Sequence, residues 1–136
     1  TVRLHGRRVL VVEDGPTVTH GGMPWGAGWL AATRVGAQVV DPRPWAAKEV
    51  AAVYARYPHI GPVLPAAGYS GAQLQALAET LNRSEADFIV AATPVDLAAL
   101  IAPNKPVVRA RYEYAEVETP GLIGRVERFL RERGLL

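Results

Sequence analysis

Short runs of β-branched and aliphatic residues alternate along this sequence with segments that carry the periodicity of amphipathic helices. The first run, residues 8–12, is followed at once by Glu13, Asp14, Gly15 and Pro16. A continuous apolar run of this length predicts a buried strand, and the acidic and Gly-Pro residues predict its end. The same order of strand, turn and helix recurs along the chain, so the sequence predicts a sheet covered by helices.

The predicted elements are joined by short turns rich in Gly and Pro. This alternation is typical of a three-layer α/β/α sandwich with a mostly parallel, five-stranded, Rossmann-like sheet. We expect residues 1–136 to form a single α/β domain. Because the chain begins at Thr1 rather than Met, we also expect further sequence upstream. Strands are expected at 8–12, 37–40, 63–66, 87–92 and 107–112, and helices at 24–34, 45–57, 70–81, 93–101 and from 119 onward.

Composition excludes several classes of protein. Of the 136 residues, 49% are hydrophobic and 21% are charged, which excludes a disordered chain. No apolar run approaches the roughly 18 to 20 residues of a membrane span, so we expect no membrane partner. The absence of cysteine excludes disulfides and thiolate metal sites, and it fits a cytoplasmic location.

The charge of the chain gives little support for nucleic-acid binding. The formal net charge is +2, and thirteen of the fifteen basic residues are arginine. The densest basic run, near the C-terminus, is interleaved with Glu127 and Glu132, which is typical of a solvated helix face. We therefore expect no nucleic-acid partner. The heavy use of Ala, Arg and Pro with little Lys indicates a GC-rich, thermophilic source.

Most of the unusual polar residues follow the predicted strands directly. In an open parallel sheet, ligands bind beyond the carboxyl ends of the strands, near a switch in strand order. We therefore expect the loops at these ends to form one ligand-binding rim for an anionic or phosphorylated small molecule. The predicted ligand-binding residues are Glu13, Asp14, Thr19, His20, Gly21, Gly22, Asp41, Arg43, Gly68, Tyr69, Ser70, Thr93 and Asp96.

The glycine-rich segment 14–28 is the most distinctive part of the sequence. Its glycines and the helix that follows could form a cradle for phosphate or carboxylate. Alternatively, Gly26 and Gly28 let that helix pack closely on the sheet. The segment matches neither the Walker pattern, because it has no Lys, nor the dinucleotide fingerprint G-x-G-x-x-G.

The chain contains three histidines, of which His20 is the candidate for chemistry. His20, in the glycine-rich loop, could bond a phosphate oxygen or transfer a proton, or it could make an ordinary polar contact. Together with His5 and His59 it shows no metal-ligand spacing, so no metal site is expected. Ser70 and Thr93 are expected to cap helices, and Gln73 stands at the capping-box spacing from Ser70.

Two pairs of charged residues each allow two interpretations. Glu13 and Asp14 could hold Mg²⁺ through water or accept the hydroxyls of a sugar or glycerate, or Asp14 could cap the following turn. Asp41 and Arg43 could form an ion pair within their own turn, or Arg43 could offer a bidentate fork to phosphate. No catalytic residue is assigned among them.

Seven motifs occur in order along the chain: RVLVVEDGPT (8–17), THGGMPWGAG (19–28), VDPRP (40–44), YPHIGPVLP (57–65), GYS (68–70), ATPVDL (92–97) and KPVVR (105–109). Together they resemble the C-terminal region of the cyclic 2,3-diphosphoglycerate synthetase family, whose members are often labelled predicted GTPases. The resemblance covers residues 6–112. In that family a P-loop domain precedes this region, and the founding activity is the ATP-dependent cyclisation of 2,3-diphosphoglycerate.

The resemblance implies a C-terminal domain whose upstream P-loop domain uses ATP or GTP with Mg²⁺, while no cofactor is expected in this chain. Ten of the candidate residues match recurring family positions, without an assignment of which are catalytic. The expected function is an anion-binding rim of a synthetase. The alternatives are a structural docking or homo-oligomerisation module and, third, a stand-alone small-molecule binding protein. The matching positions are Glu13, Asp14, His20, Gly21, Gly22, Asp41, Arg43, Tyr69, Thr93 and Asp96.

Overall fold

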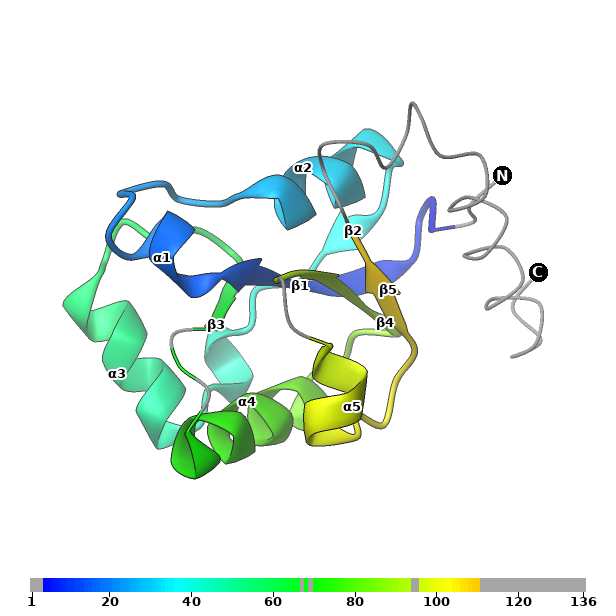
Figure 1. Ribbon diagram of the computed structural model, residues 1–136. Coiled ribbons are helices and arrows are strands. Elements are labelled where there is room, and N and C mark those ends of the chain that lie inside the picture. Colours follow the sequence, from blue (N-terminus) through cyan, green and yellow to red (C-terminus); the bar gives the residue numbers. More distant parts are fainter. Residues whose placement is uncertain (1–3, 67, 69, 94–95, 111–136) are drawn as a thin grey trace.

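The chain folds around a parallel β-sheet with helices on both of its faces (Figure 1). The computed structural model describes residues 4–66, 68, 70–93 and 96–110. Its strands are β1 (Arg8–Asp14), β2 (Gln38–Val39), β3 (Leu64–Ala66), β4 (Phe88–Ala92) and β5 (Val107–Arg109). Its helices are α1 (Gly15–Val18), α2 (Ala27–Arg34), the 3₁₀ turn η1 (Arg43–Trp45), α3 (Lys48–Arg56), α4 (Gly71–Arg83) and α5 (Leu97–Ile101).

Strand β1 is the centre of the sheet, and every strand pair is parallel. One edge of β1 pairs with β4 from Val9 to Glu13, and β4 pairs in turn with β5. The other edge of β1 is shared, because β2 pairs with its first residues and β3 with its last. The polypeptide therefore changes from one side of β1 to the other between β3 and β4, which creates a switch point at the carboxyl ends of β1 and β4.

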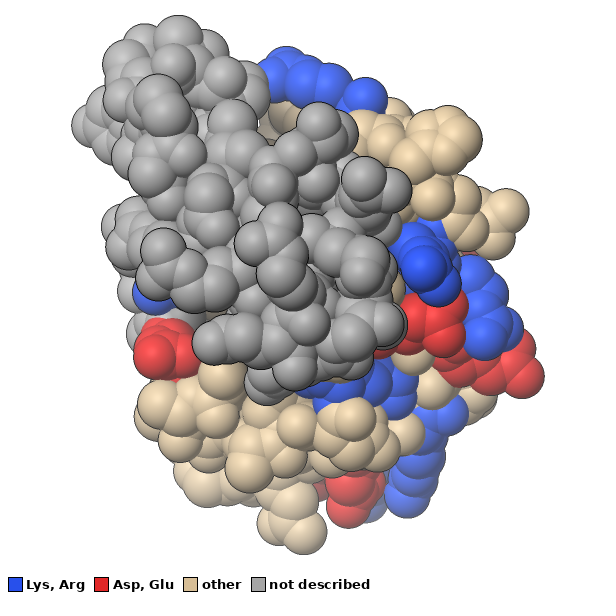
Figure 2. All heavy atoms as spheres, turned by 90° about the vertical axis from the view of Figure 1, so that its right-hand side faces the viewer, with Lys and Arg blue, Asp and Glu red and all other residues tan. Residues whose placement is uncertain are grey.

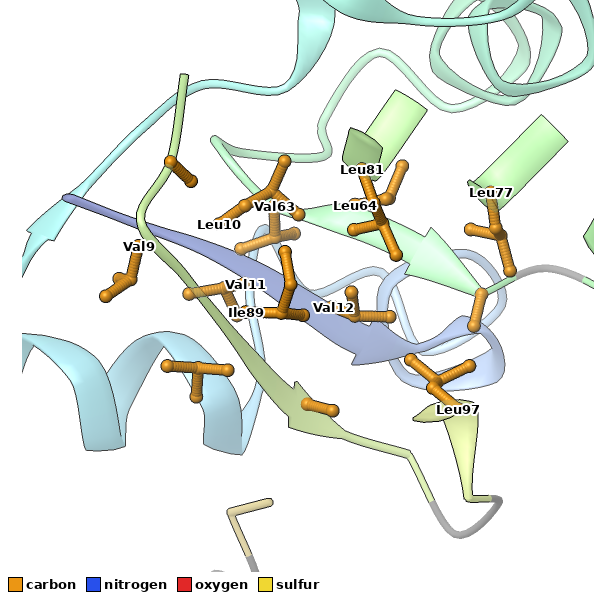
Figure 3. Packing of buried hydrophobic residues seen from close by; sticks show 14 of the residues in the cluster. Val9, Leu10, Val11, Val12, Val63, Leu64, Leu77, Leu81, Ile89 and Leu97 are labelled. Carbon is orange, nitrogen blue, oxygen red and sulfur yellow. The ribbon is translucent and has the colours of Figure 1, made fainter. Parts of the chain in front are cut away.

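The core forms on both faces of β1 because successive side chains of a strand point to opposite sides. Leu10 lies on the same side as Leu64 and Leu81, whereas Val9 and Val11 lie on the other side (Figure 3). All five side chains are fully buried. This explains why the strand is a continuous apolar run rather than an alternating one.

The helices divide between the two faces of the sheet. Helix α2 packs on one face against β1, β2 and β4, while α4 and α5 lie on the opposite face and α3 packs on α4 (Figure 1). The expected α/β, Rossmann-like fold is thus confirmed, and the sheet is parallel in every pair. The helix expected from residue 119 onward lies outside the described residues, as does the predicted end of the last strand.

Several predicted element boundaries were wrong. Helix α2 begins at Ala27 rather than at residue 24, and a four-residue helix, α1, occupies the start of the expected loop. Trp45 belongs to η1, so α3 begins only at Lys48. Ser70 stands at the N-cap position of α4, but its hydroxyl makes no capping bond, and the expected capping box is not formed.

Charged side chains of both signs are mixed on the surface. On the face shown in Figure 2, basic and acidic groups lie next to one another rather than in a patch of one sign. Arg8, for example, lies 3.5 Å from Asp87 and 3.9 Å from Glu85. Within the described part of the chain, no helix is long and apolar enough to cross a membrane.

Candidate functional site

Glu13 is the last core residue of β1, and its carboxylate is enclosed by the start of α2. Only 1% of this residue is exposed. Its Oε2 accepts hydrogen bonds from the backbone N–H groups of Gly26 at 2.7 Å and Trp29 at 2.8 Å, and its Oε1 accepts one from Gly28 at 2.9 Å. An internal carboxylate therefore satisfies amides at the helix start that would otherwise lack partners.

Gly28 lets α2 approach the sheet closely. A Cβ atom at this position would lie 2.7 Å from Cγ1 of Val11 and 3.2 Å from Cβ of Ala92. The packing interpretation of this glycine is therefore confirmed. The amide cradle expected in the same segment exists, but its amides bind the carboxylate of Glu13. Both carboxylate oxygens of Glu13 therefore already accept hydrogen bonds from the chain itself.

Asp14 follows Glu13 and has the opposite environment. Strand alternation directs its side chain to the other face of the sheet, at the switch point beyond the end of β1. The residue is half-buried, and its carboxylate makes no capping bond to α1, so the capping interpretation was wrong. No ion pair of Asp14 is found among the described residues. Its oxygens are thus available to a ligand.

Polar residues from the ends of β3 and β4 face the same edge of the sheet. Thr93 directly follows β4, is only 4% exposed and has an interaction partner. The cap of α5 is Asp96, whose Oδ1 accepts a bond of 3.3 Å from the Ala99 amide, so the expectation that Thr93 caps this helix was wrong. Gly68 and Ser70 follow β3, and Tyr69 lies outside the described residues.

Arg43 is held by groups of the protein itself. Its Nη1 donates to Oδ1 of Asp41 at 3.1 Å and to the carbonyl of Gly61 at 3.0 Å, and its Nη2 donates to the carbonyl of Ile60. The guanidinium also lies 4.4 Å from the ring centroid of Tyr54. The expected ion pair within the turn is confirmed. The remaining donors of Arg43 fix the loop before β3, which in turn donates from the Gly61 amide to the glycine-rich segment.

His20 is presented at the tip of a tight backbone turn. The amide of Gly21 donates to the carbonyl of Pro16 at 2.8 Å, and a Cβ at Gly21 would lie 2.4 Å from the carbonyl oxygen of Thr17. Gly22 has a φ of +70°, which favours glycine. The turn therefore depends on both glycines, and it places an exposed imidazole at the surface.

The ring of Tyr57 lies among the side chains of three basic residues. The His20 ring meets it edge-on with 5.9 Å between the centroids, and the His59 ring does so at 6.2 Å. The guanidinium carbon of Arg56 lies 5.5 Å from the same centroid. The Nε2–H of His59 donates to the carbonyl of Val18 at the end of α1, which fixes that imidazole.

The structure thus separates the predicted residues into three groups. Glu13 binds the start of α2, Asp41 and Arg43 bind each other and a neighbouring loop, and Asp14, His20 and Ser70 form no side-chain hydrogen bond within the described ranges. Thr19 is buried and donates to the carbonyl of Gly15 at 2.9 Å. Among the described residues no group of three or more His, Asp or Glu could hold a metal ion.

Sequence reasoning missed Tyr57, Arg56 and His59 as neighbours of His20. They stand near the end of α3, before β3, and none of them follows a strand. The YPHIGPVLP motif at 57–65 carries a signal for this cluster. Its Pro and Gly residues indicate a fixed turn, but not the partner of that turn.

The parallel sheet with helices on both faces defines the class of this protein as an α/β, Rossmann-like domain. Over 120 residues the chain is 50% identical to the arginine synthetase ArcE of Thermococcus kodakarensis. The matched segment is 88% of this chain and 27% of that protein, so the chain spans about a quarter of the relative's length. No protein-family model matches the chain, and no solved structure matches it.

Proposed function

We propose that this chain is the substrate-binding, C-terminal domain of a larger nucleotide-dependent synthetase. The observation that carries the proposal is the 50% identity to a segment of an arginine synthetase. The sequence has no P-loop motif, so a separate P-loop domain would bind ATP or GTP with Mg²⁺. The resemblance to the cyclic 2,3-diphosphoglycerate synthetases supports the same division of labour, although the named relative makes a different product.

Asp14 is the residue proposed to contact the substrate. The name of the relative gives arginine as its product, and arginine ends in a planar guanidinium. A carboxylate pairs with that group through two parallel, charge-assisted hydrogen bonds. Asp14 is half-buried at the switch point and makes no capping bond, so its oxygens are suited to such a pair. The negative charge of Asp14 favours a cationic end of the substrate at this position, whereas the sequence led to the expectation of an anion.

This domain would orient the substrate, whereas the chemistry of the nucleotide would take place on the separate P-loop domain. Glu13 fixes the start of α2 from one face of β1, while Asp14 projects from the other face of the same strand. Because both residues belong to a central strand that is buried from residue 9 to residue 13, the carboxylate of Asp14 has a rigid base. Rigid placement of a substrate group is a large source of rate enhancement in two-substrate reactions.

A chimaeric enzyme tests this proposal. The matched 120-residue segment of the T. kodakarensis arginine synthetase is replaced by this chain, and formation of arginine is measured. We expect a folded chimaera to make arginine, and Asp14→Asn to lower its kcat/KM by about tenfold or more. The matched control is Asp87→Asn, which removes a carboxylate that pairs with Arg8 before β4 and should leave activity unchanged.

Two outcomes would overturn the proposal. One is a chimaera that is folded and binds nucleotide but makes no arginine. The other is an active chimaera in which Asp14→Asn and Asp87→Asn have equal effects.

A docking function is the second candidate, and an apolar surface favours it. Trp25 and Trp29 stack with 4.0 Å between their ring centroids, and both are only partly buried. Their sequence neighbours Met23 and Leu30 are 49% and 50% exposed. Apolar side chains that form a contiguous exposed patch mark interaction surfaces more often than scattered ones do. If this surface docks a second copy, sedimentation should show a dimer that Leu30→Lys dissociates, whereas a monomer at all concentrations would exclude self-association.

A further inference from the structure

A second recognition element lies beside the proposed substrate contact, at the cluster formed by His20, Arg56, Tyr57 and His59. Two loops that are far apart in sequence build it: the turn after α1 and the turn after α3. The rings of His20 and His59 both meet Tyr57 edge-on, and Arg56 lies over the same ring. The three basic side chains are exposed and surround one half-buried aromatic ring.

The cluster has basic groups without an acidic partner. No ion pair of Arg56 or His20 is found within the described ranges of the chain. Elsewhere on this surface Arg8 and Arg83 do pair with carboxylates, at 3.5 and 3.6 Å. The stacking of Arg56 on Tyr57 leaves guanidinium N–H groups at the rim of the plane free to donate.

The positions of both histidines are fixed by the protein. His59 donates from Nε2 to the carbonyl of Val18, so its Nδ1 is the remaining ring nitrogen, and it donates to an oxyanion in the imidazolium form of the ring. The turn that carries His20 needs glycine at both following positions, since Gly21 has no room for a side chain and Gly22 has a positive φ. A rigid turn that ends in an exposed imidazole is a costly way to make a purely structural contact, whereas it suits a ligand contact.

We propose that this cluster is a binding site for an oxyanion, the phosphate or carboxylate group of a small ligand. Guanidinium and imidazole donors recognise such groups by charge-assisted hydrogen bonds. Five residues separate Asp14 from His20, four of them in α1, so the two lie on the order of 10 Å apart at a helical rise of about 1.5 Å per residue. One elongated molecule could thus present a cationic end to Asp14 and an anionic end to the cluster. The oxyanion site itself does not depend on the proposed synthetase function.

Nuclear magnetic resonance of the histidine side chains tests the site in the full 136-residue chain. Inorganic pyrophosphate is titrated in at constant ionic strength, with acetate in a parallel arm to distinguish phosphate from carboxylate. We expect the imidazole signals of His20 and His59 to shift along one saturable curve. The internal control is His5, which lies before the start of β1 and packs against Gly36. Its imidazole signal should not shift.

Matched arginine variants complete the test. Arg56→Gln replaces the arginine at the last position of α3 and so removes its guanidinium. We expect it to weaken pyrophosphate binding about tenfold, as for the loss of one charge-assisted pair. Arg83→Gln changes the last residue of α4, where the arginine pairs with Glu79, and should leave binding unchanged. The site is refuted if neither anion shifts His20 and His59, if His5 shifts with them, or if both arginine variants have the same effect.

The test separates this site from the proposed function. Asp14→Asn should not change pyrophosphate binding at the cluster, and Arg56→Gln does not touch the carboxylate on which the chimaera experiment depends. Failure of the chimaera would therefore leave the oxyanion titration interpretable, and failure of the titration would leave the Asp14 experiment interpretable.

Discussion

Glu13 brings a carboxylate into the core and surrounds it with three backbone donors at 2.7 to 2.9 Å. Hydrogen bonds to a charged group are stronger than neutral ones, and a buried donor without a partner is costly. Glu13→Gln keeps the size of the side chain but turns an amide NH₂ toward backbone N–H groups. We expect it to lower the free energy of unfolding by about 3 kcal/mol, measured by urea denaturation.

A carboxylate at the surface provides the control for this prediction. Glu85 is 72% exposed in its side chain and lies 3.9 Å from Arg8. We expect Glu85→Gln to change the free energy of unfolding by less than about 0.5 kcal/mol, since exposed pairs contribute little. Equal effects of the two substitutions would show that the three bonds of Glu13 do not stabilise the start of α2.

Gly28 provides a second prediction at the residue scale. Gly28→Ala would place a methyl group 2.7 Å from Cγ1 of Val11, so helix and strand must move apart. We expect a loss of about 2 kcal/mol in the free energy of unfolding, the usual cost of overpacking a core. Gly71→Ala is the control, because a methyl group at the start of α4 meets no atom within 4 Å. Thermal melts of both variants should show destabilisation only at Gly28.

Contacts between elements decide how α3 meets β3. The hydroxyl of Tyr54 on α3 donates to the carbonyl of Val63 at 2.6 Å, beside the loop that Arg43 holds. Burial raises the pKa of the Tyr54 hydroxyl well above its usual value, with a smaller opposing effect from the Arg43 charge and a further small rise from Asp41. The folded protein therefore keeps the proton of this hydroxyl at pH values where the unfolded chain loses it.

The raised pKa of Tyr54 makes the free energy of unfolding depend on pH. A hydroxyl whose pKa is raised on folding contributes fully to the free energy of unfolding below its unfolded pKa of about 10. Its contribution to this free energy falls as the pH rises further. Tyr54→Phe removes both the hydrogen bond and this titration. We expect the variant to be less stable than the parent by about 1 kcal/mol near neutral pH, and the difference to shrink above about pH 10. Urea denaturation across this range measures it, and a constant difference would contradict the assignment.

The elements themselves were largely predictable from the sequence, whereas their starts were not. The continuous apolar run of β1 and the buried positions Leu77 and Leu81 of α4 followed from periodicity alone. The start of α2 did not, because its cap is a carboxylate thirteen residues upstream of Gly26 rather than a neighbour in sequence. Local capping rules therefore placed the helix three residues too early, at Pro24.

On the scale of the whole molecule, the candidate site could be predicted only in part. The rule that ligands bind beyond the strand ends selected Asp14 and His20, which keep side chains open to ligand. It also selected Arg43, whose donors are taken by Asp41 and the loop before β3. Whether a polar group is open depends on contacts between segments distant in sequence, and a single sequence does not encode these contacts in a readable pattern.

The distribution of charge gives the last prediction. Net charge is only +2, and pairs such as Arg8 with Asp87 and Arg83 with Glu79 are exposed and no closer than 3.5 Å. Salt screens such surface pairs, but it hardly reaches the buried carboxylate of Glu13. We expect the free energy of unfolding to change by less than about 1 kcal/mol between about 0.05 and 0.5 M NaCl.

The same salt series, applied to the variants, tests where the electrostatic stabilisation lies. Because the bonds of Glu13 are shielded from solvent, the destabilisation by Glu13→Gln should be the same at both ends of the series. A destabilisation that disappears in high salt would mean that water and ions reach this carboxylate. In that case the start of α2 would open in solution, and its amides would again be available to the anion that the sequence first led us to expect.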